Sequence, residues 1–198
     1  MLTSVSVRVR HRVAIACLAL AAAGAARPCG FEDPSSVAGQ RGIVNLAFPK
    51  SAWVSTAVWQ AQKAGDLPPD ALARRDDLTP QARASAQIIR VTWLLKSLAK
   101  RLDGAPGAMD RPAIAVVLMG PMLWSRIEPR EGDIAARAHI HVGGPEPGDV
   151  VLVTDTPAIE AIVGVGMRFE RAQELGLVRL YGSAAQVGAV QVWMGSVH

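Results

Sequence analysis

Residues 148–182 place the strongest limits on how this chain can fold, because strand and helix signals alternate there with glycines at the joints. The apolar run at 150–153 follows a Gly-Asp turn and is typical of a strand that is buried on both faces. Thr156 as N-cap and Pro157 at the first helical position predict that a helix begins directly after this strand. Gly164 and Gly166 end the apolar helical pattern, so this helix is expected to be short.

A shorter helix and a returning strand complete this stretch. The helix is expected from about Arg168 to Gly176, and residues 177–181 then alternate as a strand does. The phrases VVLVTDTPAIEAIV and MRFERAQELGLVRLYG, with this order of elements, resemble the C-terminal half of the sterol carrier protein 2 (SCP2)-like domain. Ala172, Gly176 and Gly182 match the small residues of that family's pattern. The matching segment contains no catalytic signature.

The sequence before this stretch predicts a long helix and three further strands. Thr79 is the expected cap of the helix and Pro80 its first residue, and the helix runs to about residue 102. Six of its apolar residues are expected to point inward: Ala82, Ala86, Ile89, Trp93, Leu94 and Leu98. Turn residues separate three apolar runs that predict strands, at 113–119, 122–128 and 134–142. A last amphipathic helix is predicted at 184–194.

These elements predict an α+β domain at residues 78–198. We expect a five-stranded, mainly antiparallel sheet with helices packed on one face, which is also the fold that the resemblance to the SCP2-like family implies. The chain is thereby divided into a signal peptide at 1–26, an N-terminal arm with a helix at 27–77, and this domain.

The first 26 residues have the three parts of an export signal. Arg8, Arg10 and Arg12 form a positive region, residues 13–23 are apolar, and small residues follow around Ala25. The apolar run is shorter than the roughly 18 residues that a membrane span needs. Removal of the signal leaves 18 Lys and Arg against 17 Asp and Glu, a net charge of +1. The protein is therefore expected to be periplasmic or secreted.

The N-terminal arm lies outside the resemblance. Residues 29–42 are rich in Gly, Pro and Ser and predict an irregular segment, while 43–48 predict a short strand or an extended lead-in. A helix is expected at 51–64, with Ser51 as its cap. Whichever form it takes, this arm is long enough to cover a ligand site or to bind a protein partner.

Three residues of the arm invite a functional interpretation. Trp53 and Trp59 flank the predicted helix, where they would pack it onto the domain or form an aromatic binding surface. Cys29 is the single thiol expected after removal of the signal, so no internal disulfide is expected. Pairing with another chain, metal ligation and simple burial all remain open for this thiol.

Charge and motif content argue against several classes of function. The sequence has no clustered basic stripe with interleaved aromatic residues, so we expect no nucleic-acid binding. Ser97 and Lys100 have the S-x-x-K spacing of serine acyl enzymes, but the companion motifs are absent. Gly164 and Gly166 lack the third glycine of a dinucleotide loop. We therefore expect no cofactor and no enzymatic activity.

His139 and His141 form the most suggestive metal-binding pair, because residues two apart on a strand point to the same face. No nearby Cys or carboxylate completes a known spacing, so the pair also fits a structural role on an exposed face. Met119 and Met122 are soft donors that would join the two histidines in a copper site. The same methionines are equally suited to a hydrophobic core.

The resemblance to the SCP2-like family implies an apolar tunnel between sheet and helices that holds a fatty acyl chain, a sterol-like molecule or another lipid. The family's ligand contacts are diffuse apolar positions, so we name candidates by pattern: Met119, Leu123, Ile140, Ile159, Ile162, Phe169 and Leu175. An exported protein that binds an apolar small molecule is the first interpretation. An accessory protein with a filled tunnel and a copper-handling protein that uses His139 and His141 remain open.

Overall fold

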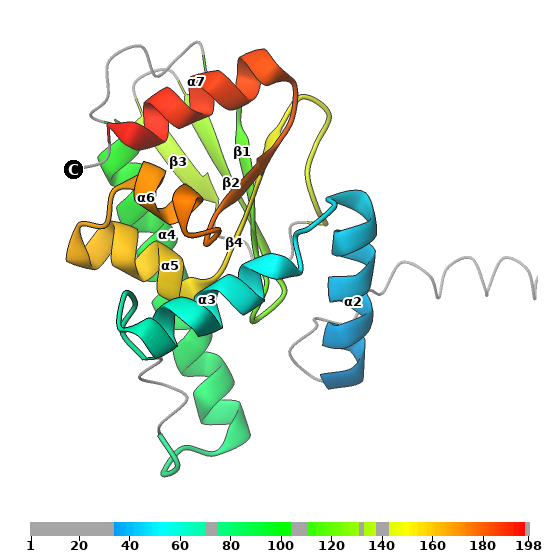
Figure 1. Cartoon of the computed structure of the whole chain (residues 1–198), viewed down its shortest axis with the longest axis vertical. Coiled ribbons are helices and arrows are strands. Elements are labelled where there is room, and N and C mark those ends of the chain that lie inside the picture. The colour runs from blue at the N-terminus through cyan, green and yellow to red at the C-terminus, as the bar shows by residue number, and fades with distance from the viewer. Residues whose placement is uncertain (1–33, 70–74, 104–110, 131–132, 138–142, 197–198) are drawn as a thin grey trace, which may run out of the picture.

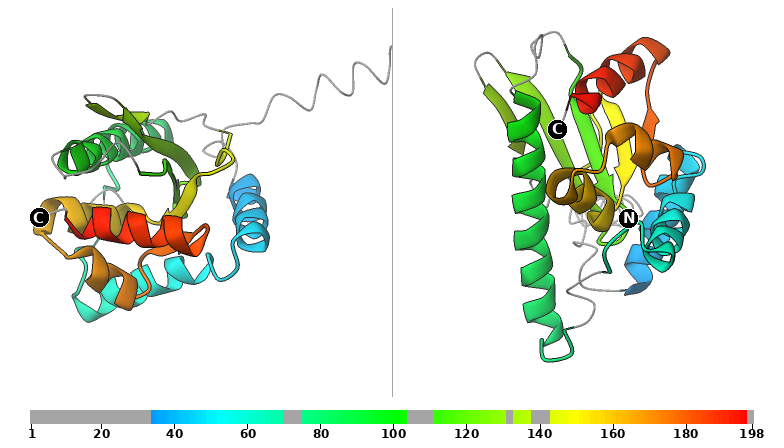
Figure 2. Two further views of the ribbon diagram at one scale, coloured as in Figure 1. Left: turned by 90° about the horizontal axis from the view of Figure 1, so that it is seen from above. Right: turned by 60° about the vertical axis from the view of Figure 1, so that its left-hand side comes forward.

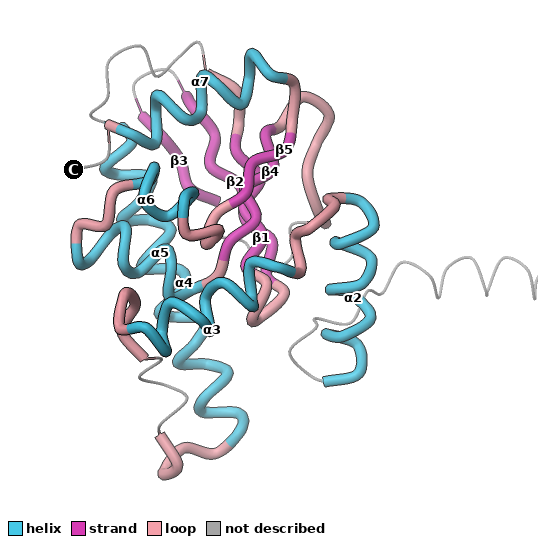
Figure 3. The backbone as a smooth tube through the Cα atoms, in the orientation of Figure 1, coloured by secondary structure: helices cyan, strands magenta, loops and turns pink. Residues whose placement is uncertain are grey.

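The computed structural model describes residues 34–69, 75–103, 111–130, 133–137 and 143–196 (Figure 1). Three helices come first: α2 (Pro34–Ala47), α3 (Trp53–Ala64) and the long α4 (Pro80–Asp103). Three strands follow: β1 (Ile114–Leu118), β2 (Leu123–Arg130) and β3 (Asp133–Arg137). The remaining elements are β4 (Val150–Thr154), α5 (Thr156–Glu160), the π-helix η2 (Ala161–Val165), α6 (Phe169–Glu174), β5 (Arg179–Tyr181) and α7 (Ala184–Gly195) (Figure 3).

The strands form a mixed sheet in the order β3-β2-β1-β4-β5. β1 runs parallel to β4, with Ile114 beside Val150, and the other neighbouring strands are antiparallel. The two central strands, IAVVL and VVLVT, are apolar or hydroxyl-bearing at every position and buried along their whole length. Such continuous runs suit strands that are covered on both faces. The predicted α+β class is confirmed.

The two faces of the sheet carry different side chains, because successive residues of a strand point to opposite sides. We call the face of Leu123, Ser125 and Ile127 the inner face, and the opposite face of Trp124 and Arg126 the outer face. The pairing of β2, β1 and β4 places position 150 on the inner face. A Cβ atom added to Gly182 would lie 3.4 Å from Val150 and 3.6 Å from Val187, so α7 lies over the inner face.

Helices α4 to α7 form one layer over the inner face (Figure 2). The indole Nε1 of Trp193 in α7 donates to the carbonyl oxygen of Leu102 in α4, at 3.0 Å. Earlier along α4, Arg90 forms an ion pair with Glu160 of α5. These two contacts join the C-terminal helices to the long one across more than 60 residues of sequence, and the core lies between this layer and the sheet.

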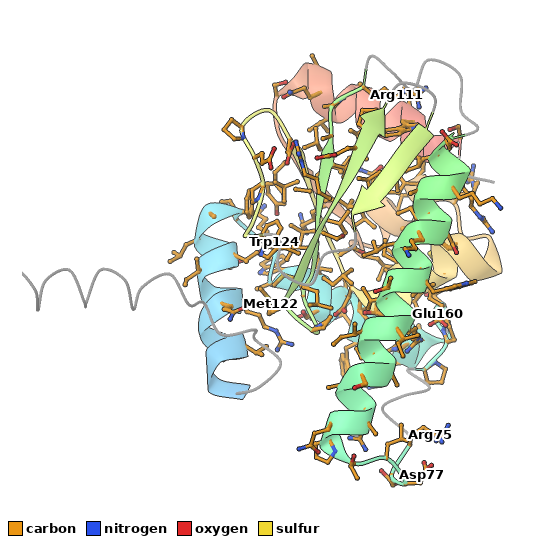
Figure 4. All side chains as sticks on the ribbon, turned by 180° about the vertical axis from the view of Figure 1, so that it is seen from behind. Arg75, Asp77, Arg111, Met122, Trp124 and Glu160 are labelled. Carbon is orange, nitrogen blue, oxygen red and sulfur yellow. The ribbon has the colours of Figure 1, made fainter. Side chains whose placement is uncertain are left out.

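The segment that joins α2 to α3 lies on the outer face. The ring of Phe48 lies 6.2 Å from that of Trp124 and 5.4 Å from that of Tyr181, measured between centroids. The Tyr181 hydroxyl donates to the carbonyl oxygen of Pro49, at 2.6 Å. Figure 4 accordingly places Trp124 next to α2. The segment between α2 and α3 therefore covers the aromatic part of this face.

The prediction of an irregular or extended segment at 29–48 is wrong for the described residues from 34 onward, which form helix α2. Glycine disfavours helix, and α2 contains Gly39 and Gly42. Tertiary contacts compensate for this. Val44 is buried in the core, and Arg41 donates to the carbonyl oxygens of Met119 and Gly120, at 2.8 and 2.6 Å.

Helix α4 begins as predicted, because the Thr79 hydroxyl accepts a hydrogen bond from the Ala82 amide, at 3.2 Å. The prediction that Ile89 and Trp93 point inward is wrong, since both are exposed. The buried side chains of this helix are Val91, Leu94, Leu95, Leu98, Ala99 and Leu102. The buried stripe of this helix is therefore rotated about the helix axis by about one residue from the predicted stripe.

Two predicted caps are also corrected. Asp155, not Thr156, is the N-cap of α5, and its carboxylate accepts from the Thr156 amide at 2.8 Å. Helix α3 begins after Ala52 instead of Ser51, and the Asn45 side chain accepts from the Ala52 amide at 3.1 Å. No helix within the described ranges is long and apolar enough to span a membrane.

Candidate functional site

The apolar layer between the inner face and the helices contains most of the side chains predicted to contact a ligand. Met119, Leu123, Ile159, Ile162 and Phe169 are all buried in one contiguous core cluster. Leu175 is half-buried and packs against the same cluster. Ile140 lies outside the described residues. The predicted residues thus come together from the sheet, α5, η2 and α6.

The turn from β4 into α5 is held by hydrogen bonds that fix the start of this helical wall. The Thr156 hydroxyl accepts from the Gln87 side chain of α4, at 3.3 Å. A Cβ atom added to Gly120 would lie 2.6 Å from Oδ1 of Asp155, so the cap carboxylate needs a glycine beside it. These contacts place Ile159 and Ile162 against α4.

Helix α5 changes after one turn into the π-helix η2, which carries Ile162. It ends at Gly166, whose φ of +79° is a left-handed conformation. Single π turns within helices are rare, and they are frequent at functional sites. The wall of the apolar layer is therefore least regular at Ile162.

Ser125 is a polar exception on the inner face. It lies between Leu123 and Ile127 on β2 and opposite Val116 on β1. The residue is buried, and within the described part of the chain its hydroxyl has no hydrogen-bond partner. Thr154 on the same face is also buried, but its hydroxyl donates to the carbonyl oxygen of Leu177, at 3.0 Å. A buried polar atom without a partner costs roughly 1–3 kcal/mol, so Ser125 needs an explanation.

Sequence reasoning missed Ser125, although a signal for it was present. In the alternation Leu123, Ser125, Ile127, the serine occupies a position that the period of two assigns to the core. The sequence does not show whether the hydroxyl of Ser125 has a hydrogen-bond partner. That property depends on which groups the tertiary structure brings within reach.

The outer face carries an electrostatic cluster around Arg126. Its guanidinium contacts Asp149 at 2.8 Å, Glu146 at 2.7 Å and also Glu128. The hydrogen bond that Arg126 donates to the almost fully buried carboxylate of Asp149 raises the pKa of Arg126 above its ordinary value. Because Asp149 directly precedes β4, this cluster ties β2 to the loop that leads into the central strand. Its charges face away from the apolar layer.

The predicted metal site stays a prediction. His139, His141 and Cys29 lie outside the described residues. Met119 and Met122 are both buried in the core cluster. Across the parts of the chain that the structure describes, no three His, Cys, Asp or Glu side chains are arranged to hold a metal ion.

Comparison with known proteins gives one structural similarity. No protein-family model matches the chain, and no curated protein matches it. The crystal structure of sterol carrier protein 2 like 2 from Aedes aegypti is similar at 12% sequence identity, with a TM-score of 0.38. The match covers 52% of this chain and 95% of that one.

Proposed function

We propose that this chain is an exported, non-enzymatic protein that binds an apolar ligand with one hydrogen-bonding group between the inner face of the sheet and the helix layer. The observation that carries the proposal is the Ser125 hydroxyl, which is buried and has no hydrogen-bond partner among the residues that the structure describes. A hydroxyl or carbonyl group on an otherwise apolar molecule would satisfy it. Long-chain alcohols, acids and sterol-like alcohols have this chemistry.

The surroundings of Ser125 support an apolar body for the ligand. Its neighbours on the inner face are Leu123, Ile127 and Val116, and the core cluster to which these three residues belong also contains Ile159, Ile162 and Phe169. None of these side chains carries a charge, so the ligand would be held by burial of apolar surface with a single polar contact. No chemical step follows from such a set of groups.

A matched pair of ligands tests this function. Binding of 1-decanol and of decane is measured by displacement of an environment-sensitive acyl-chain probe from the wild type and from Ser125→Ala. The wild type is expected to bind decanol more tightly than decane. Ser125→Ala should weaken decanol binding about fivefold to tenfold, the value of one hydrogen bond, and leave decane binding unchanged. Failure of the wild type to bind the probe and both ligands would refute the proposal.

Two substitutions at Ile162 separate an open interior from a filled one, which is the accessory-protein alternative. In a filled core, Ile162→Ala costs roughly 2–5 kcal/mol of unfolding free energy and Ile162→Trp is poorly tolerated. Where the site borders a ligand space, Ile162→Ala costs less, and Ile162→Trp leaves the fold intact and displaces the probe. The near-complete burial of Ile162 is the observation that favours the filled alternative. Thermal unfolding with and without decanol distinguishes the two.

A further inference from the structure

Large apolar side chains are exposed where α2 meets α3. Ile43, Leu46 and Trp53 are 67%, 84% and 63% exposed. The two helices are nevertheless firmly placed, because Val44 and Val54, next to these residues in sequence, are buried in the core. The three side chains are therefore exposed although both helices are packed onto the core.

Hydrogen bonding brings these residues to one corner of the molecule. The side-chain oxygen of Asn45 accepts from the amide of Ala52, at 3.1 Å, and so joins the last turn of α2 to the start of α3. Leu46 and Trp53 each directly follow one of these two residues. Trp59 lies farther along α3 and is 60% exposed, with the Lys63 ammonium 5.3 Å from its ring centre. We call Ile43, Leu46 and Trp53 the corner patch, and Trp59 is a further exposed tryptophan of the same helix.

The charge around the corner patch has one sign. Residues 34–65 contain three basic residues, Arg41, Lys50 and Lys63, and no acidic residue. From Asp66 to the C-terminus, 14 Lys and Arg face 15 Asp and Glu. Lys50 and Lys63 are the two charges beside the exposed apolar side chains, whereas Arg41 donates to the carbonyl oxygens of Met119 and Gly120. Residues 80–102 of α4 are also basic, with five Arg and Lys and no acidic residue, so α4 is the competing surface.

We propose that the corner patch docks on an anionic lipid surface. Tryptophan favours the interface between headgroups and acyl chains, and exposed Leu and Ile side chains gain free energy by entering it. Lysines beside such residues attract anionic headgroups, and residues 34–65 contribute no carboxylate that would oppose docking. A protein partner fits less well, because lysine is depleted in protein–protein interfaces. This inference holds whether or not the interior binds a ligand.

The experiment measures binding to sucrose-loaded vesicles by co-sedimentation. Vesicles of phosphatidylethanolamine and phosphatidylglycerol are compared with vesicles of phosphatidylcholine. The protein is expected to bind the anionic vesicles more tightly, and salt should weaken this binding. Ile43→Ser/Trp53→Ser should weaken it at least tenfold. Lys50→Gln/Lys63→Gln should weaken it about fivefold for each lysine removed.

Helix α4 offers a matched control. Ile89 and Trp93 are 71% and 61% exposed, so Ile89→Ser/Trp93→Ser removes the same two side-chain types at nearly equal exposure. This double variant should bind anionic vesicles like the wild type. Every variant keeps the same residues 1–33, so a difference between variants cannot come from the apolar run at 13–23. A second readout is quenching of tryptophan fluorescence by brominated lipid, which Trp53→Phe/Trp59→Phe should abolish with little loss of binding.

Three results would overturn the proposal. One is failure of the wild type to bind anionic vesicles. Another is loss of binding in Ile89→Ser/Trp93→Ser and not in Ile43→Ser/Trp53→Ser, which would assign the contact to α4. The third is a dimer, detected by sedimentation equilibrium, that Ile43→Ser/Trp53→Ser dissociates, because the corner patch would then be covered by a second copy of the chain.

Discussion

Tyr181 is the single tyrosine of the chain, so its ionisation is observable without interference. Burial against Phe48 and the sheet raises the pKa of its phenol above the ordinary value of 10.0, while the nearby Arg179 lowers it by less. The phenol must also be protonated to donate to Pro49. Both effects favour the neutral form in the folded protein.

We expect the phenolate absorbance of the folded protein near 295 nm to appear at a higher pH than that of the unfolded chain. Because the folded-state pKa is the higher one, the unfolded chain loses its proton first, and stability falls as pH rises through and beyond about 10. Tyr181→Phe should remove this pH-dependent loss and should cost about 1 kcal/mol at neutral pH through the lost hydrogen bond. Identical titration of Tyr181 in folded and unfolded protein would contradict its placement.

Removal of either of two buried hydroxyls on the inner face should change the stability of the protein, but in opposite directions. Ser125→Ala deletes a hydroxyl without a partner, so the unliganded protein should be as stable as the wild type or more stable by up to about 2 kcal/mol. Thr154→Val deletes a donor and leaves the buried carbonyl of Leu177 unsatisfied, which should cost roughly 1–3 kcal/mol. Urea unfolding measures both. A loss of stability in Ser125→Ala equal to that in Thr154→Val would show that the Ser125 hydroxyl has a partner.

At the scale of the element, the predicted N-caps of α3 and α5 were wrong by one residue and that of α4 was right, whereas the predicted buried face of α4 was wrong. Pro80 after Thr79 and the Ser183 capping box mark where α4 and α7 begin, because caps act over three or four residues. Which stripe of α4 is buried depends on the surface that it meets. Ile89 and Trp93 are apolar and still exposed, since the sheet and α5 contact the neighbouring stripe.

Gly176 ends helix α6 in a left-handed conformation, with φ of +73°. We expect Gly176→Val to lower the unfolding free energy by more than 1 kcal/mol, because a β-branched side chain resists this conformation. Gly188→Ala is the control. A Cβ atom at Gly188 meets nothing within 4 Å, so this change inside α7 should stabilise by about 0.5–1 kcal/mol. Equal melting temperatures for wild type and Gly176→Val would show that the conformation at 176 is not required.

At the scale of the whole molecule, the N-terminal helices and the sheet share one core. Val54, Val58 and Ala61 of α3 belong to the same cluster of buried side chains as β1 and β4. Leu67, which follows α3, is buried in it as well. A shared core couples the stability of the two parts. The domain boundary at residue 78 stays a prediction from the sequence pattern.

Leu67→Ala should therefore lower the stability of the entire chain by roughly 2–5 kcal/mol, although the residue lies outside the segment that resembles the SCP2-like family. Leu46→Ala is the matched control, and at 84% exposure it should change stability by less than about 0.5 kcal/mol. Far-ultraviolet circular dichroism and tryptophan fluorescence should report one coincident transition in both variants. Separate transitions in Leu67→Ala would mean that the N-terminal helices unfold independently.

The sequence by itself determined the elements whose signals are local. The apolar runs that became β1 and β4, the cap and proline that start α4, and Gly176 after α6 each act through their own backbone and nearest neighbours. The predicted α+β class followed from the order of these elements. The burial of Ile159 and Ile162 followed from their helical spacing beside a strand, while their contact with a ligand stays a prediction.

Only the tertiary structure decided the features that depend on distant groups. Residues 34–47 became a helix in spite of two glycines, since Arg41 binds carbonyl oxygens 78 and 79 residues later in the chain and Val44 is buried in the core. Ser125 differs from Thr154 only in what lies within reach of its hydroxyl. Exposure of Trp53 and Trp93 likewise depends on what packs beside them. Local sequence specifies conformation, whereas burial and hydrogen-bond partnership are properties of contacts that form only when the chain has folded.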